Sequence, residues 1–215
     1  WMPPPDLVAT AVSDGSRDGK IAWIDQRRLR REAESRGGVM VLDTKVGAFV
    51  PEGQQLARFY AAEPLDEEGQ ESLVAAFGIG PRRDLRYDLE FGFRQLVDIA
   101  DRALSSGIND PLTAVEVIDE LHRILRLTGR RGLPPAHLYD DDGNLRVVLR
   151  PVTYAGLLDL AVDEIAHYGA DSLQVPRRLR AMLDDLAAVV RPEFRRDVDR
   201  KRRELDNRGE QPGKG

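Results

Sequence analysis

Residues 84–127 carry the clearest hydrophobic periodicity in the chain. Across residues 89–104, apolar side chains recur at the spacing that places them on one side of an α-helix, and charged side chains fill the other side. A Ser-Ser-Gly-Ile break follows, in which Gly107 can supply the left-handed residue common at helix ends. Asp110 and Pro111 are residue types preferred at an N-cap and at a first helical position. The pattern predicts a helical hairpin with Asp110 as a helix cap.

Before this hairpin, apolar runs are short and are separated by turns rich in Gly, Pro and Asp, which is typical of strands. The expected elements are strands at 7–12 and 21–24 that form a hairpin, a helix at 26–36, a strand at 39–42, and two strands around a turn at 51–53. An acidic hinge at 63–70 and a helix at 71–77 follow.

After the hairpin, Gly and Pro mark a loop, and longer periodic segments return. The expected elements are a strand pair at 138–139 and 146–149 around a turn at 140–144, helices at 154–168 and 176–190, and a charged, solvated or partner-binding helix at 192–207. The sequence therefore predicts an α+β fold. We expect a β-rich, half-barrel-like N-terminal module at 1–62, a mainly helical domain at 63–208, and a disordered tail at 209–215.

Composition narrows the classes of function. The formal net charge of −5 argues against a general nucleic-acid binder, which needs a basic surplus. The chain has no cysteine, which excludes disulfides, thiol nucleophiles and cysteine-ligated zinc. No apolar run approaches the roughly 18 residues of a membrane helix, and the chain opens on a linker-like Trp-Met-Pro-Pro-Pro segment.

The polar side of the first predicted helix holds Arg94, Asp98 and Arg102 at four-residue spacing, with Phe91 among them. Such a ladder is usually a solvated row of weak ion pairs. An aromatic ring on a wet face gains little burial, so Phe91 favours a covered face. Either a second copy of the chain covers it, making a homo-oligomer, or the later helix at 154–168 does.

Four carboxylates, Asp84, Asp88, Asp98 and Asp110, could be read as the centre of a metal-dependent hydrolase. Acidic residues are also common near helix N-termini, where they meet the positive end of the helix dipole. No His or Cys accompanies them at ligand spacing. We therefore assign no catalytic, cofactor-binding or metal-binding residue and keep the hydrolase as the alternative hypothesis.

The remaining candidates have simple structural interpretations. His122 lies beside an apolar stripe, His137 lies in a proline-rich loop, and His167 follows Asp163 by one helical turn and is expected to form an ion pair. Lys45 lies near a strand–turn–strand pattern like that of lipoyl or biotinyl carrier domains, but lacks the flanking residues of a modified lysine. We expect a structural barrel there, because fold analogy alone does not carry function.

The string FGFRQLVDIADRALSSGINDPLTAVEVIDELHRIL resembles the signature of a bacterial membrane-protein family, domain-of-unknown-function family 2254. RQLVDIA and GINDP are its most specific parts. The resemblance implies an integral membrane protein with N-terminal transmembrane helices and a soluble portion, to which this chain would correspond. It further implies a cell-membrane location, with this portion expected on the cytoplasmic side. The leading hypothesis is a non-enzymatic extramembrane domain for assembly or ligand sensing, with its own transmembrane segment as a partner.

Overall fold

The protein folds as two compact units, each with its own hydrophobic core. The computed structural model describes residues 1–209. The first unit comprises Trp1–Phe91 and Pro134–Pro151, and the second comprises Gly92–Leu133 and the chain from Val152 onward. Strands are confined to the first unit in the described residues, and helices make up the second, which confirms the predicted α+β class.

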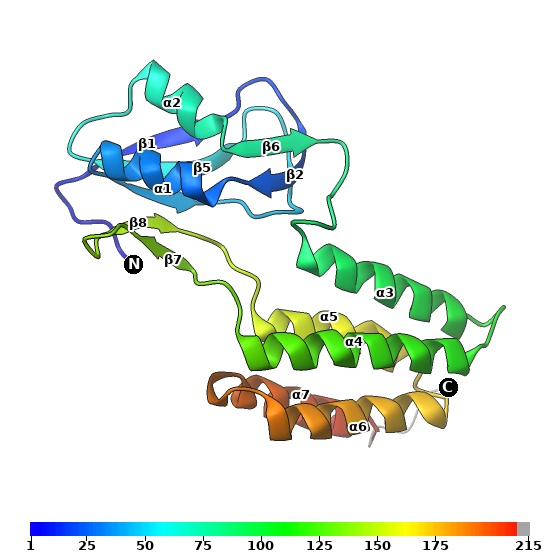
Figure 1. Ribbon diagram of the computed structural model, residues 1–215. Helices are drawn as coiled ribbons and strands as arrows, with labels where there is room; N and C mark the ends of the chain where they lie inside the picture. The colour runs from blue at the N-terminus through cyan, green and yellow to red at the C-terminus, as the bar shows by residue number, and fades with distance from the viewer. Residues whose placement is uncertain (210–215) are drawn as a thin grey trace. The chain divides into compact units, whose positions relative to one another are not determined.

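Two sheets and two helices build the first unit (Figure 1). The neighbours in each sheet are antiparallel except β3 and β8, which are parallel. The helices are α1 (Gln26–Ser35) and α2 (Glu67–Val74). The five-stranded sheet has the order β1 (Val8–Ser13), β5 (Gln55–Ala61), β3 (Val39–Leu42), β8 (Leu145–Val148), β7 (His137–Tyr139), and the three-stranded sheet has the order β4 (Phe49–Val50), β2 (Gly19–Ile24), β6 (Phe77–Gly80).

Alternating burial along the strands explains this core. Met40 and Leu42 of β3 face inward while their neighbours are half-buried, as expected for a strand with one face on a core. Leu29 of α1 and Leu73 of α2 pack into the same cluster. Both helices begin at an aspartate whose carboxylate accepts a backbone N–H three residues later, at 3.0 Å for α1 and 2.9 Å for α2.

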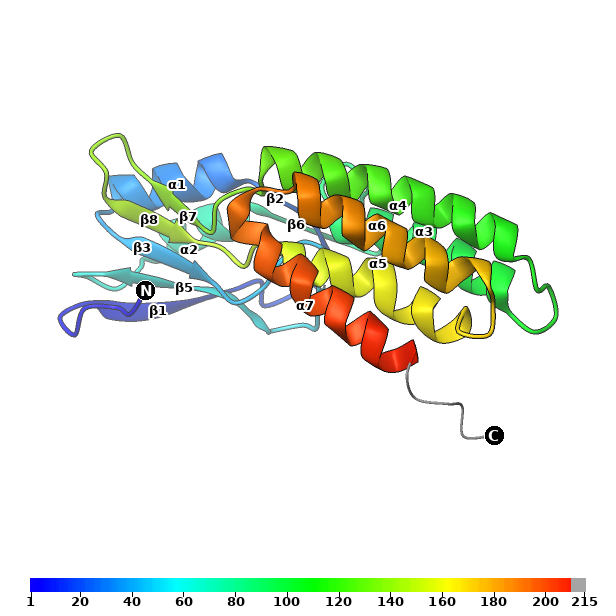
Figure 2. The same cartoon turned by 90° about the horizontal axis from the view of Figure 1, so that it is seen from below.

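Five helices build the described part of the second unit, and they run side by side in both views (Figures 1 and 2). Their shared core is closed by Tyr154, whose ring stacks on Phe194 at 4.6 Å between ring centroids. The Tyr154 hydroxyl donates to the carbonyl of Leu125 at 3.1 Å. The helices are α3 (Leu89–Leu104), α4 (Pro111–Arg131), α5 (Tyr154–Tyr168), α6 (Gln174–Val189) and α7 (Pro192–Gly209).

The predicted hairpin of β1 and β2 is wrong. Both strands exist, but β1 pairs with β5, while β2 pairs with β4 and β6 in the other sheet. The two strands around the turn at 51–53, β4 and β5, also lie in different sheets. β5 is buried along nearly its whole length and lies between β1 and β3.

The predicted domain boundary at residue 62 also differs from the structure. The first unit extends to Phe91 because β6 pairs with β2, and it takes in residues 134–151 because β8 pairs with β3. The helix expected at 71–77 begins at Glu67 instead and ends at Val74, followed by β6. The predicted strand pair β7–β8 is confirmed. Apart from Gly209, the predicted tail lies outside the described residues.

The central helices are present with altered details. α3 spans Leu89–Leu104, as the periodicity predicted, and α4 packs most extensively against α6 rather than against α3. The left-handed residue of the intervening turn is Asn109, with φ of 50°, and not Gly107. Asparagine is one of the few residues with a side chain that adopts this conformation readily.

Candidate functional site

The polar side of α3 is partly covered by its own chain. Arg94 Nη1 lies 2.6 Å from Glu164 Oε2 of α5, so this arginine forms an ion pair within the second unit. The contact raises the pKa of Arg94 and, chiefly through that arginine, lowers the pKa of Glu164. Arg94 is therefore covered by α5, the helix at 154–168, as the competing interpretation expected.

Phe91 belongs to the first unit and is half-buried. The guanidinium carbon of Arg83 lies 4.9 Å from its ring centroid, a cation–π geometry. Arg83 is held by Asp88, with its Nε 2.6 Å from Oδ2 and its Nη2 2.8 Å from Oδ1. Gly47 is required beside this pair, because a Cβ there would lie 2.4 Å from the Asp88 carboxylate.

Asp98 and Arg102 are exposed and form no ion pair within residues 1–209. Ile99 lies between them in sequence and is also exposed. Beside it, a groove between α3 and α4 is lined by apolar and charged side chains, namely Leu96, Ile99, Thr113, Glu116, Val117, Asp119, Glu120 and Arg123. Of the four residues expected to form an interface, two are thus used inside the chain and two remain available.

The four carboxylates of the hydrolase alternative are divided between the two units. Asp84 and Asp88 belong to the first unit, and Asp98 and Asp110 belong to the second. Asp84 pairs with Arg86 at 2.7 Å, and Asp88 both holds Arg83 and accepts the N–H of Phe91 at 2.9 Å. No cluster of three or more metal-ligating side chains occurs in the part of the chain that the structure describes.

Asp110 occupies the N-cap of α4. Its Oδ1 accepts the backbone N–H of Thr113 at 3.2 Å, and its Oδ2 accepts the Thr113 hydroxyl at 2.6 Å. The hydroxyl bond and the backbone bond together lower the pKa of this carboxyl. Pro111 follows in the first turn, where its missing N–H is not needed.

His122 joins a charged network between α4 and α6. Arg178 Nη2 lies 2.8 Å from His122 Nδ1, and because arginine can only donate, Nδ1 must accept. The proton is then on Nε2, which donates to Asp185 Oδ2 at 2.8 Å. Asp185 also pairs with Arg126. This geometry fixes the tautomer and orientation of the ring.

The structure also places the remaining residues that the sequence analysis considered, namely Lys45, His137 and His167. Lys45 Nζ lies 2.5 Å from Glu90 Oε2, so its charge is already paired. His137 is half-buried on β7. The ring of His167 stands edge-on to Tyr168, at 5.0 Å between centroids, and its expected partner Asp163 instead binds Lys201 and Arg208.

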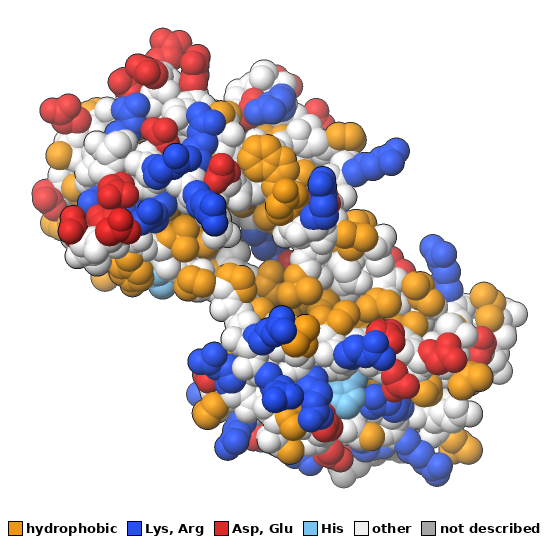
Figure 3. Space-filling model, viewed as in Figure 1, with side chains coloured by type: hydrophobic (Ala, Val, Ile, Leu, Met, Phe, Trp, Pro, Cys, Tyr) orange, Lys and Arg blue, Asp and Glu red, His pale blue; other side chains and the backbone are white. Residues whose placement is uncertain are grey.

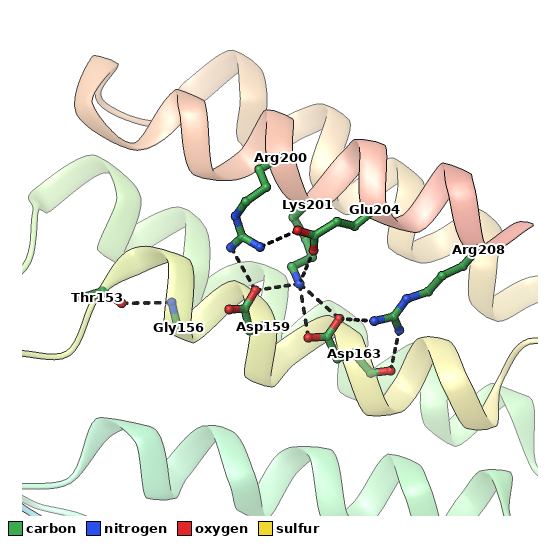
Figure 4. Close-up of polar contacts among 8 residues, drawn as sticks. All are labelled: Thr153, Gly156, Asp159, Asp163, Arg200, Lys201, Glu204 and Arg208. Carbon is green, nitrogen blue, oxygen red and sulfur yellow. Dashed lines mark hydrogen bonds and ion pairs between the residues drawn. The ribbon is translucent and has the colours of Figure 1, made fainter.

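Sequence reasoning missed the buried lysine of α7. Lys201 is 1% exposed, and its Nζ lies 2.6 Å from Asp159, 3.1 Å from Asp163 and 2.8 Å from Glu204 (Figure 4). Burial alone would lower the pKa of Lys201, but the three carboxylates outweigh it and raise that pKa. The sequence spacing could have revealed this burial, because Lys201 lies on the same helix face as the core residues Val198 and Leu205. α7 is thus a packed helix and not a solvated one.

Sequence reasoning also missed Asp101. Its Oδ1 is buried and has no hydrogen-bond partner within residues 1–209. Burial first, and then the neighbouring carboxylate of Glu164, raise the pKa of Asp101 to about 6. Arg94 opposes the shift, since it favours the charged form. Two carboxyls and one arginine therefore share the contact between α3 and α5.

Comparison with known proteins places this chain in a family. Residues 3–185 match the family model described as "Predicted membrane protein (DUF2254)". Uncharacterized proteins of Mycobacterium bovis and Mycobacterium tuberculosis are 31% identical over 192 residues. The match covers 87% of this chain but only 36% of those relatives, so the chain spans about a third of their length. No solved structure matches.

The described residues contain no helix with the length and apolarity needed to span a bilayer. The family model nevertheless covers most of the sequence and includes the strings RQLVDIA and GINDP. The chain therefore belongs to the DUF2254 family of predicted membrane proteins.

Proposed function

We propose that this chain is a non-enzymatic extramembrane part of a membrane protein, and that its second unit assembles copies through the exposed surface of α3 and α4. The observation that carries this is a set of exposed apolar side chains on α3, α4 and the turn between them, where the two helices also form a groove; Tyr168 and Leu173, which are exposed too, lie at the end of α5 and in the α5–α6 turn. Ile99, Ile108 and Leu112 are 47%, 63% and 62% exposed, and all three lie on α3, α4 or the turn between them.

The opposite character of α6 and α7 supports this choice of surface. There the outer side chains are charged and paired with one another, as in Arg180 with Asp206 and Arg202 with Asp184. Such a face is already satisfied by its own ion pairs. Large apolar side chains left in water gain free energy when a partner covers them, at roughly 25 cal/mol per Å² buried.

The charges around the α3–α4 surface suit a symmetric contact. α3 offers Asp98 and Arg102, which form no ion pair within residues 1–209, whereas Glu120 and Arg123 of α4, at the groove, pair with each other at 3.2 Å. Around a two-fold axis, each acid of one copy can meet a base of the other, and every such pair forms twice. Apolar residues inside a charged rim are the usual composition of a protein interface.

Support for a non-enzymatic role comes from the carboxylates. Asp84 and Asp88 each pair with an arginine, Asp110 caps a helix, and the described residues hold no cluster of three or more such groups. A hydrolytic centre needs such groups to converge on one substrate atom. We further propose the cytoplasmic side for this portion, which the cysteine-free sequence favours. A protease-accessibility map of the full-length protein tests that side.

Light scattering on the purified chain tests the assembly. We expect the wild type to show at least twice the single-chain mass of 24.1 kDa and the double variant Ile99→Glu/Leu112→Glu to return to the mass of one chain. The melting temperature should change little, because both side chains are exposed. The matched control is Tyr168→Glu/Leu173→Glu, which adds the same charge at two exposed positions, the last residue of α5 and the α5–α6 turn. A wild-type monomer at every concentration, or equal effects of both double variants, would contradict the proposal.

A further inference from the structure

The first unit carries an exposed aromatic hollow where β2 leads into α1. Its walls are Trp23, Ile24, Asp25, Gln26, Arg27 and Tyr87. The Trp23 ring rests on Gly78 of β6, where any Cβ would lie 2.2 Å from its Nε1. Trp23 and Tyr87 are nevertheless 38% and 56% exposed, so both rings lie partly open to solvent.

Basic side chains surround this hollow. Arg27 and Arg31 lie one turn apart on α1, both are exposed, and neither forms an ion pair within the described residues. The Arg86 guanidinium lies 5.6 Å from the ring centroid of Tyr87, and its charge is paired with Asp84. The nearby acid Asp25 is occupied as the cap of α1. Figure 3 shows Lys and Arg side chains around an apolar patch over α1 and β2, whereas acidic side chains gather over α2.

We infer that this face of the first unit, defined by Trp23, Tyr87, Arg27 and Arg31, binds the surface of an anionic lipid bilayer. Tryptophan and tyrosine prefer the headgroup level of membranes, because each has an apolar ring and a polar edge. Arginines beside them attract anionic headgroups, and each contributes about a fivefold gain in partitioning. Membership of a membrane-protein family places such a surface within reach of a bilayer. The inference concerns the first unit and does not depend on assembly by the second.

The charge of the chain favours a bilayer over nucleic acid as the anionic partner. Nucleic acid is bound through several phosphate contacts along a basic surface, whereas this face has two arginines unpaired within the described residues and the chain as a whole has a net charge of −5. A small basic and aromatic face can still dock on a flat anionic surface, because charges farther than about 10 Å away are largely screened. An acidic protein segment is the competing occupant, and the experiment must separate it from lipid.

Flotation with vesicles of phosphatidylcholine, with and without phosphatidylglycerol, tests the inference on the whole 215-residue chain. We expect binding only to the anionic vesicles, weakened by added salt. Arg27→Glu/Arg31→Glu should reduce it by at least about tenfold. Arg177→Glu/Arg203→Glu is the matched control, since these arginines are exposed and make no ion pair in the described chain, and it should bind as the wild type does.

Fluorescence gives a second readout at the hollow itself. The chain has two tryptophans, so Trp1→Phe leaves Trp23 as the only indole. Its emission should shift to shorter wavelength on anionic vesicles and stay unchanged with inorganic phosphate at the same ionic strength. Absence of binding to anionic vesicles, or equal losses in the two arginine double variants, would overturn the inference and leave a protein segment as the occupant.

Discussion

At the scale of single residues, the second unit is distinguished by two ionisable groups placed inside it. Lys201 is surrounded by acids and is fully satisfied, whereas Asp101 has a buried oxygen without a partner. Their positions on amphipathic helices are visible in the sequence, but their contacts are not. The acids that contact Lys201 are set by how α7 is positioned along α5. Hydrophobic periodicity shows which face of each helix is buried but not how the two helices align.

Removing the Lys201 charge should destabilise the second unit. Lys201→Ala leaves Asp159, Asp163 and Glu204 facing one another, and we expect a loss of about 2–3 kcal/mol in the free energy of unfolding, reduced from the usual range because the acids are partly solvated. Urea unfolding measures it. Lys201→Arg should retain most of the stability, and the exposed neighbour Arg203→Ala should cost little.

This effect should depend on pH in a defined direction. The pKa values of Asp159 and Glu204 are lowered, since hydrogen bonds to Lys201 and Arg200 outweigh burial. Their contribution is present above the ordinary carboxyl range and is lost as the pH falls through their folded pKa values. The difference between the wild type and Lys201→Ala should therefore shrink in acid. A difference that is the same at neutral and acid pH would contradict this explanation.

Asp101 should act in the opposite sense. Its pKa is raised from 3.8 to about 6, so the folded chain holds a proton that the unfolded chain releases between these values. This stabilisation is present at low pH and is lost as the pH rises through about 6. Asp101→Asn mimics the protonated form, and we expect it to melt above the wild type near neutral pH but close to it near pH 4. Thermal melts measure this.

The exposed neighbour Asp98→Asn is the control for Asp101, because it removes one charge from the same helix without touching a buried oxygen. It should leave the pH dependence of melting as in the wild type. If Asp101→Asn and Asp98→Asn shift together at every pH, the contact between Asp101 and Glu164 does not control stability.

At the scale of elements, local signals predicted where most helices lie. α5 runs from Tyr154 to Tyr168 as expected, because Thr153 caps it and Gly169 follows it. Strand pairing was less predictable. β1 and β2 are adjacent in sequence, but each finds its partner far along the chain, and no local pattern encodes that choice. β6 was missed because it is short and glycine-rich.

The start of α4 gives a prediction that separates capping from chemistry. Asp110→Asn keeps an acceptor for the Thr113 N–H and should be mild, whereas Asp110→Ala removes it and should lower the melting temperature by about 2–4 °C. A thermal scan of both variants measures this. Should Asn prove as harmful as Ala, the carboxylate would have a role beyond capping.

At the scale of the whole molecule, the sequence indicated the α+β class and the family but not the division into units. Residues 134–151 leave the helical region to add β8 to a sheet of the first unit, a long-range step that composition does not reveal. Only two of the four residues expected at the interface remain available, because long-range packing also decides which side chains are covered. Arg94 and Asp98 look equivalent on a helical projection, and only the packing of α5 shows that Arg94 is already paired.

Self-association through α3 and α4 is the central claim, and the absence of cysteine allows a direct measurement of it. Ile99→Cys and Leu112→Cys each introduce a single thiol on the proposed interface, and Leu173→Cys introduces one at an exposed position of the α5–α6 turn. Under mild oxidation, the account predicts that a covalent dimer forms rapidly at one or both interface positions and slowly at the control. Dimer formation no faster at Ile99 and Leu112 than at Leu173 would contradict it.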